Sequence, residues 1–254
     1  MLQILAHKLE IIGQYCVFLG EICRSSFKRP FRFSRYLLEV EVLGVNSVLI
    51  ILLSGGAIGM IFALQMVSLL QPFQAEVGVG AAVAVALSRE MAPVITTLML
   101  IAKNGSAMAA ELGTMRVTEQ IDALESMAVS AVHYLVLPKV LASLVVFPVL
   151  TLLANVIGTA GAYIISVYVF DIDSASYLDY MFRFLFPRDI ITGLIKAAVM
   201  GVIVATICCF NGLRASQGAK GVGDSATKAV VASSVTILVA DYFLTTLMLP
   251  YIYA

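Results

Sequence analysis

Tryptophan is absent from this sequence, and histidine occurs only twice, at His7 and His133. Charged residues make up 13% of the 254 residues, whereas an ordinary soluble domain has about 25%. Two histidines exclude a histidine-rich metal site, and so few charges cannot cover a soluble globule of this length. Lys plus Arg and Asp plus Glu number 16 each, so there is no bulk positive charge for nucleic acid. Hydrophobic residues instead reach 61%, which predicts an all-α integral membrane protein.

Motifs for catalysis and cofactor binding are also missing. The four cysteines, Cys16, Cys23, Cys208 and Cys209, show neither a disulfide framework nor the paired spacing of a zinc site, so we interpret them as small hydrophobes. There is no GxxxxGK[ST] phosphate loop, no GxSxG and no HExxH. We therefore expect a non-catalytic chain with no metal or cofactor, and any ATP and Mg²⁺ must be bound by a partner.

Charge-free runs locate the membrane spans. Charges are missing between Glu41 and Glu76, between Lys139 and Asp171, and after Asp241. A bilayer core about 30 Å thick needs roughly 20 apolar residues as a helix. The third run can reach about 45 Å, so it is tilted, kinked at Pro148, or longer than the bilayer is thick. The sequence predicts five spans, at about 46–70, 78–102, 139–168, 190–212 and 228–250.

Lys and Arg are distributed unevenly over the connections. The N-terminal segment and the connections 103–139 and 213–228 together hold 12 of them, whereas 71–78 and 171–189 together hold 2. By the positive-inside rule the N-terminus is cytoplasmic, and five spans place the C-terminus on the periplasmic side.

The N-terminal residues 1–27 form an amphipathic pattern rather than a signal peptide. Apolar residues recur at steps of three and four, and we expect a helix lying in the cytoplasmic interface. A soluble helix packed on a partner is the alternative. The chain divides into this interfacial region, 1–43, and one five-span membrane domain, 44–254. The stripe comprises Leu2, Leu5, Leu9, Ile12, Cys16, Leu19 and Cys23.

Charges also fall inside the predicted spans, at Arg89, Glu90, Lys196 and Asp241. Such groups usually face a bundle interior or a cavity, because hydrocarbon cannot solvate them. Arg89 and Glu90 are consecutive on a helix and cannot face one another. They either line a polar cavity or are satisfied by other helices of the bundle. Asp241 is predicted to face the interior, near polar groups of another span.

The segment 103–128 is the longest polar stretch between predicted spans. It is acidic where the positive-inside rule predicts basic residues, and it has partial helical periodicity. A short coupling helix that docks on another protein and a solvated loop helix are about equally compatible with this spacing. The residues that we assign to coupling are Glu111, Arg116, Glu119, Gln120 and Asp122.

A mainly apolar stripe runs along the outer half of the first span. Phe and Met give an adaptable surface suited to acyl chains, although such a stripe is more often ordinary packing. Arg89 and Glu90, on the neighbouring second span, are the nearest charged groups to this stripe. The candidate lipid-binding residues are Phe62, Gln65, Met66, Leu69, Leu70, Phe73, Arg89 and Glu90.

Several blocks resemble the signature of MlaE-type permeases, the membrane subunits of ABC systems that work with MCE-domain lipid carriers. The Lys103-Asn104-Gly105 block departs from the Arg-Ala-Gly common in that family, and Ser130-Ala131 departs from its usual Asp or Pro. The matching blocks are Ser54-Gly55, Ile58-Gly59-Met60 and Gln65; Arg89-Glu90-Met91-Ala92-Pro93-Val94; Gly105-Ser106-Ala107; Ala110-Glu111-Leu112-Gly113; 115–124; Phe210-Asn211-Gly212; Gly218–Gly223; Ala226-Thr227; Ala229-Val230-Val231; and Asp241.

This resemblance implies a homodimeric permease in the bacterial inner membrane, moving phospholipid for outer-membrane lipid homeostasis. Its implied partners are a second copy of the chain, two ABC ATPase subunits, a periplasmic MCE-domain protein and a small cytoplasmic accessory subunit. The alternative is a non-ABC membrane scaffold, or a secondary transporter with a charged intramembrane site. The odd number of spans and the lack of an internal repeat disfavour an inverted-repeat transporter.

Overall fold

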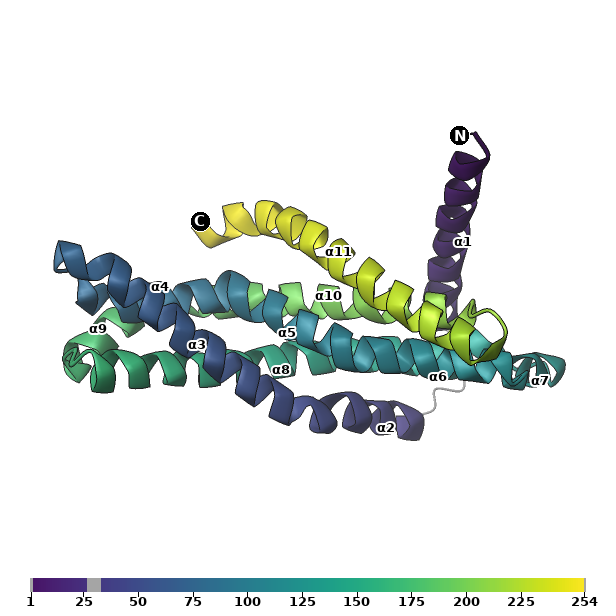
Figure 1. The fold of residues 1–254 in the computed structure, drawn as a ribbon, viewed down its shortest axis with the longest axis horizontal. Coiled ribbons are helices and arrows are strands. Elements are labelled where there is room, and N and C mark those ends of the chain that lie inside the picture. The colour runs from purple at the N-terminus through teal and green to yellow at the C-terminus, as the bar shows by residue number, and fades with distance from the viewer. Residues whose placement is uncertain (1, 27–32, 254) are drawn as a thin grey trace.

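The computed structural model describes residues 2–26 and 33–253, with side chains described for 10–26 and 33–250. Helix is the only regular structure in this part of the chain (Figure 1). The elements are α1 (Leu2–Ser26), α2 (Phe33–Gly44), η1 (Val45–Ser47), α3 (Val48–Leu70), η2 (Gln71–Phe73), η3 (Glu76–Gly78), α4 (Val79–Ala86), η4 (Leu87–Met91), α5 (Ala92–Leu100), η5 (Ile101–Gly105), α6 (Ser106–Val117), α7 (Gln120–Ser126), η6 (Val132–Val136), α8 (Leu137–Ile164), η7 (Ile165–Val169), α9 (Ser174–Phe184), α10 (Pro187–Leu213) and α11 (Gly218–Tyr253).

Within the described residues, five helical stretches are long and apolar enough to cross a membrane, which confirms the predicted fold class. Each predicted span lies inside one of them, but the stretches are longer. The second runs from Glu76 to Val117, so residues 103–117 continue a helix rather than forming a connection. Charge-free runs mark only the part that needs hydrocarbon, whereas the backbone stays helical beyond it. The stretches are Phe33–Phe73, Glu76–Val117, Val132–Val169, Pro187–Leu213 and Gly218–Pro250.

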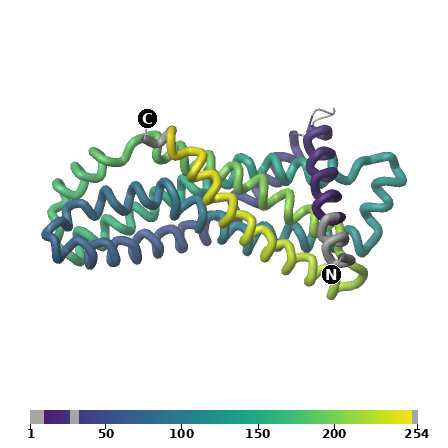
Figure 2. The backbone as a smooth tube through the Cα atoms, turned by 90° about the horizontal axis from the view of Figure 1, so that it is seen from above, coloured from purple at the N-terminus to yellow at the C-terminus, as the bar shows by residue number. Residues whose placement is uncertain are grey.

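Helix α1 crosses the long axis of the bundle instead of running along it (Figures 1 and 2). Phe18 and Ile22 are buried against the bundle, and the Tyr15 hydroxyl lies 2.8 Å from Thr206 Oγ1. The described members of the predicted apolar stripe point elsewhere, since Cys16 and Cys23 are exposed. The side chains of Leu2, Leu5 and Leu9 lie outside the described residues. A helix held crosswise with an exposed apolar stripe has the form of an interfacial helix.

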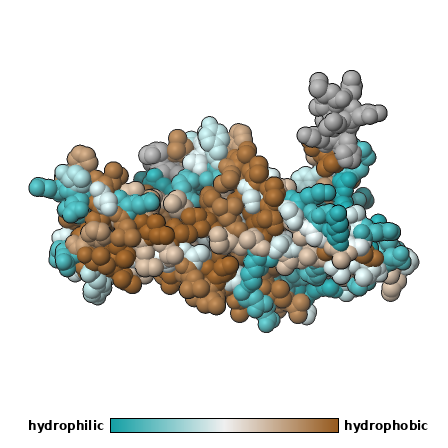
Figure 3. Space-filling view, in the orientation of Figure 1, coloured by the Kyte–Doolittle hydropathy of each residue, from teal (hydrophilic) through white to brown (hydrophobic). Residues whose placement is uncertain are grey.

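Apolar surface forms a broad band over the middle of the molecule, and hydrophilic surface gathers at the end formed by α6 and α7 (Figure 3). Under this band α3 and α8 pack tightly. A Cβ built on Gly59 would lie 1.9 Å from the backbone oxygen of Gly158, so only glycine permits this approach. Small residues allow such close packing of membrane helices, and here they act within one chain.

Replacing Gly59 by alanine is expected to destabilise the protein. The new methyl group meets backbone rather than a flexible side chain, and overpacking of this kind costs about 1–3 kcal/mol. Gly223→Ala in α11 is the matched control, because a Cβ there meets nothing within 4 Å. Thermal unfolding in detergent should show a lower midpoint for Gly59→Ala only. Equal midpoints for the two variants would contradict the packing.

Candidate functional site

Four charges predicted inside the spans meet where η4, α10 and α11 come together. The element η4 is a π-helical turn that carries Arg89 and Glu90, while Lys196 lies on α10 and Asp241 on α11. Asp189, in the first turn of α10, joins them. Ionisable groups far apart in the sequence thus form one polar cluster within an apolar bundle.

Arg89 and Glu90 bind different partners. The guanidinium of Arg89 contacts Asp189 Oδ1 from Nε at 2.9 Å and from Nη2 at 2.8 Å. Glu90 Oε2 accepts a hydrogen bond from Lys196 Nζ at 2.6 Å. The two consecutive side chains diverge as expected, and both are paired inside the same bundle.

Lys196 is the centre of the cluster, and its residue exposure is 0%. Besides Glu90, its ammonium donates to Thr245 Oγ1 at 2.7 Å and lies 3.3 Å from Asp241 Oδ1. Asp241 therefore faces another span, as predicted. Lys196 joins η4 to α11 through α10, a role that the sequence did not reveal.

A proline explains one further contact of Lys196. Pro93 lacks a backbone N–H, so it cannot donate to the carbonyl four residues earlier, which is that of Arg89. Lys196 Nζ donates to this oxygen at 3.1 Å. The ammonium thus donates to a backbone acceptor to which the proline cannot donate.

The helix α10 reaches η4 because Gly193 has no side chain. A Cβ at Gly193 would lie 2.0 Å from the carbonyl oxygen of Ser88. This close approach lets the short carboxylate of Asp189 and the long chain of Lys196 contact the π turn from one helix.

The cluster is closed on one side and open on the other. Asp189 and Lys196 side chains are 0% exposed, whereas those of Arg89 and Glu90 are 23% and 40% exposed. Counted by formal charge, three carboxylates face two cations. The open side therefore presents one cationic and one anionic side chain, Arg89 and Glu90.

The candidate lipid stripe divides into two faces. Phe62, Met66 and Leu70 are partly buried and pack on the core of α3, α4, α8 and α9. Leu69 and Phe73 are exposed by 59% and 75%, and Gln65 is exposed as well. The stripe predicted from the sequence is therefore two rows in the structure: a packed row of Phe62, Met66 and Leu70, and an exposed row of Gln65, Leu69 and Phe73.

The candidate coupling residues lie in two places, four of them at or beside α7 and Glu111 apart from them on α6. Glu119 caps α7 with φ +57° and is exposed, as are Gln120 and Asp122. Arg116 Nη1 forms an ion pair of 2.6 Å with Asp122. The buried Ile121 anchors this short helix, so its polar side chains point outward.

Glu111 belongs to a second ion cluster. Its Oε2 accepts from Lys139 Nζ at 2.8 Å, and Glu39 Oε1 lies 2.9 Å from the same ammonium. Lys139 is 3% exposed and Glu39 is 7% exposed. This cluster ties α2, α6 and α8 together near the polar end of the bundle.

Sequence reasoning did not identify Asp189, Thr245 or Glu39 as partners. Asp189 and Glu39 lie outside the predicted spans 190–212 and 46–70, and a threonine such as Thr245 is too common in apolar helices to signal a role. The available signal was the excess of unpaired charge, since Lys196 at membrane depth requires an acidic partner.

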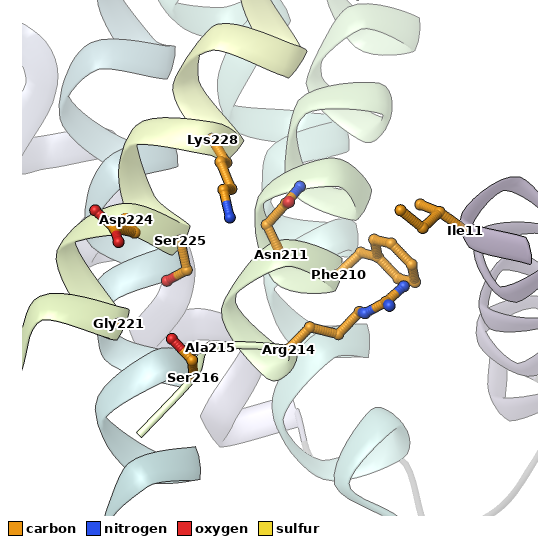
Figure 4. A pocket seen from close by; sticks show the side chains of 10 residues that line it. All are labelled: Ile11, Phe210, Asn211, Arg214, Ala215, Ser216, Gly221, Asp224, Ser225 and Lys228. Atoms are coloured by element: carbon orange, nitrogen blue, oxygen red, sulfur yellow. The ribbon is translucent and has the colours of Figure 1, made fainter. Parts of the chain in front are cut away.

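A further pocket of about 260 Å³ lies between the end of α10 and the start of α11 (Figure 4). Asn211 of α10 and Lys228 of α11 lie on its two sides, and Arg214 extends toward the Phe210 ring, with its Cζ 5.0 Å from the ring centroid. A Cβ at Gly221 would meet the Ser216 carbonyl oxygen at 2.0 Å, so the glycine allows the turn into α11. This pocket contains several residues of the blocks noted in the sequence.

Comparison with known proteins agrees with this architecture. The chain matches the family described as Permease MlaE over residues 36–247. It is 39% identical to a probable ABC transporter permease protein of Rickettsia bellii, over 93% of this chain and 91% of that protein. It is also 39% identical to the intermembrane phospholipid transport system permease protein MlaE of Haemophilus influenzae, over 83% of this chain and 81% of that protein. The chloroplastic TRIGALACTOSYLDIACYLGLYCEROL 1 protein of Arabidopsis thaliana is 37% identical, over 90% and 65% respectively.

The variant Lys196→Met is expected to destabilise the bundle by about 3–5 kcal/mol, because it leaves Glu90 and Asp241 without their cation. Adding Glu90→Gln and Asp241→Asn should restore most of the loss, since the neutral groups need no counter-ion. Lys220→Met, at an exposed position, is the control. Unfolding in detergent measures all four proteins, and an unrestored triple variant would show that charge pairing is not the cause.

Proposed function

Since the chain belongs to the MlaE permease family, we propose that it is the non-catalytic membrane subunit of an ABC transporter that moves phospholipid between the inner membrane and a periplasmic MCE-domain carrier. The observation that carries this proposal is the polar cluster around Lys196, set inside a five-helix apolar bundle and open at Glu90. A headgroup needs polar contacts within an apolar path, and this arrangement supplies both.

An ATPase partner is supported by the form of α7. This helix projects beyond the long helices at the hydrophilic end (Figure 1) and exposes Glu119, Gln120 and Asp122. An amphipathic helix anchored by one buried residue is suited to lie in a groove of a partner. The energy source must be external, because the sequence has no phosphate loop. A small accessory subunit on this side belongs to the same proposal.

A second copy of the chain is supported by α11. Only 11% of its most apolar window is buried, against 56% for α10 and 50% for the stretch that contains α8. α11 packs on α10 and α6, but a membrane helix with so few buried residues in its apolar part has a face left for lipid or for another subunit. We place a lipid cavity between two copies, with the exposed row of Gln65, Leu69 and Phe73 on its wall and its opening toward the periplasm.

An ion-coupled secondary transporter is the second candidate, and the cluster of five charges within the bundle favours it. The two candidates differ in partners and energy source. Affinity purification of the chain should recover an ABC ATPase with a phosphate loop, and lipid transfer to an MCE-domain protein in proteoliposomes should require ATP. Transport driven by a cation gradient without an ATPase would support the second candidate.

Charge reversal on α7 tests the coupling surface. The double variant Glu119→Lys and Asp122→Lys should release the ATPase or abolish lipid-stimulated ATP hydrolysis, because acidic contacts become repulsive. Since Asp122 also pairs with Arg116, the swap Arg116→Asp with Asp122→Arg keeps that ion pair while changing the surface. Normal hydrolysis and assembly in the double variant would exclude this docking surface.

Photocrosslinking tests the lipid path. Benzophenone side chains at Leu69 and Phe73 should capture phospholipid in membranes more than one at Leu53 does. Leu53 lies on the same helix with 67% exposure, close to the 59% of Leu69. Mass spectrometry of the adducts gives the ratio. Equal labelling at all three positions would mean that the stripe is an ordinary lipid-facing surface.

A further inference from the structure

An apolar cleft, of about 580 Å³, opens between α8, α9 and the start of α10. Its walls include Leu152, Val156 and Ile164 from α8 and Leu178 and Phe182 from α9, all at least partly exposed at the rim. No charged residue lines it. The cleft is separate from the exposed row of α3 and from the open side at Glu90.

The cleft has one unusual group in its wall, the side chain of Asn155. This residue is 6% exposed, and neither Nδ2 nor Oδ1 has a hydrogen-bond partner among the described residues. The nearby Thr159 hydroxyl does not help, because it donates to the backbone oxygen of Asn155 at 2.8 Å. An amide without partners in an apolar surrounding is costly, and hydrocarbon cannot satisfy it. The group therefore points to a ligand with a hydrogen-bonding function.

The walls of the cleft are fixed in place. Tyr177 is fully buried between α9 and α4, and its ring occupies the space that a Cβ on Gly80 would need. Met181, one turn later, is also buried. These two side chains anchor α9, so Leu178 and Phe182 are held at the rim. The cleft is thus a formed feature of the fold rather than a gap beside a loose helix.

The size and chemistry of the cleft select its occupant. Its volume lies within the roughly 300–1,000 Å³ of small-ligand sites. A helix about 10 Å wide with a 1.5 Å rise fills roughly 120 Å³ per residue, so the cleft holds only about five residues of one. The lack of charge disfavours a phosphate or an ammonium group inside. A hydrocarbon chain with a neutral polar group fits both the walls and Asn155.

We propose that this cleft binds an acyl chain of a phospholipid, with the ester group of that chain hydrogen-bonded to the Asn155 amide. Ser88 also lines the cleft and immediately precedes Arg89, so the cleft reaches the back of the polar cluster. The cleft is a lateral lipid site on the bundle, through which a membrane lipid approaches that cluster. The identity of the ligand rests on the proposed function, whereas the site itself rests on the cleft and its unpartnered amide.

Crosslinking from one helix face tests this site. A benzophenone side chain is placed at Val156, in the cleft, or at Val149, outside it. Both lie on the same face of α8, two turns apart, with exposures of 58% and 60%. The full chain, with the subunits that co-purify, is studied in nanodiscs of phosphatidylethanolamine and phosphatidylglycerol. The probe at Val156 should give about fivefold more phospholipid adduct than the probe at Val149. This ratio corresponds to the net binding free energy of roughly one hydrogen bond.

Two variants then show whether the cleft is responsible. Asn155→Leu keeps the volume but removes the amide, and Ala160→Trp fills the cleft from an exposed position. Both should reduce adducts at Val156 to the level at Val149, with assembly unchanged. An undiminished Val156 adduct in both variants, equal adducts at the two probes, or a peptide adduct in place of lipid would overturn the proposal. Lipid transfer to the carrier is measured separately, so its failure with normal crosslinking would count against the proposed function and not against the cleft.

Discussion

A charge in a low-dielectric bundle must be paired, and the structure around Lys196 follows from that requirement. Its ammonium contacts a carboxylate of η4, a hydroxyl of α11 and the Arg89 carbonyl, to which Pro93 cannot donate. Gly193 provides the space that brings α10 close enough for these contacts. The side chain of Lys196 and the absence of a side chain at Gly193 therefore determine how η4, α10 and α11 meet. The packing of α3 on α8 has a different cause, because small residues there allow the two helix backbones to come into contact.

The parts of this fold that depend on local composition could be predicted from the sequence. Long apolar runs with few or no charges predicted all five spans, because burial in hydrocarbon acts on every residue of a run. Asp241 was correctly assigned to the interior for the same reason. Helix ends were placed too early, as at residue 102, because a helix continues past the bilayer when its polar side chains reach water. The extension to Val117 is stabilised by tertiary contacts such as Glu111 with Lys139, which no local pattern encodes.

Partner identities depend on geometry and could not be predicted. Asp189 has no sequence feature that separates it from other charges beside a span, yet it holds Arg89. The division of the outer stripe into packed Phe62 and exposed Leu69 depends on which neighbour lies against α3. The π turn at η4 shifts the register of the second span. The partners toward which Arg89 and Glu90 point could therefore not be predicted from the periodicity of a regular α-helix. The assignment of these residues to lipid and of α7 to coupling is still a prediction.

The order of the Lys196 partners along the chain has a consequence for biogenesis. Membrane segments are made from the N-terminus onward, so the segment carrying Arg89 and Glu90 is synthesised before α10. Insertion of a lysine alone at the centre of a helix costs about 2.5–3.5 kcal/mol on translocon scales. When α10 leaves the ribosome, an acceptor carbonyl and a carboxylate are already present in the chain, and Asp241 arrives last. Lys196 thus enters the bilayer when its counter-ion Glu90 is already in the chain, and Asp241 of α11 then completes the ion pairing.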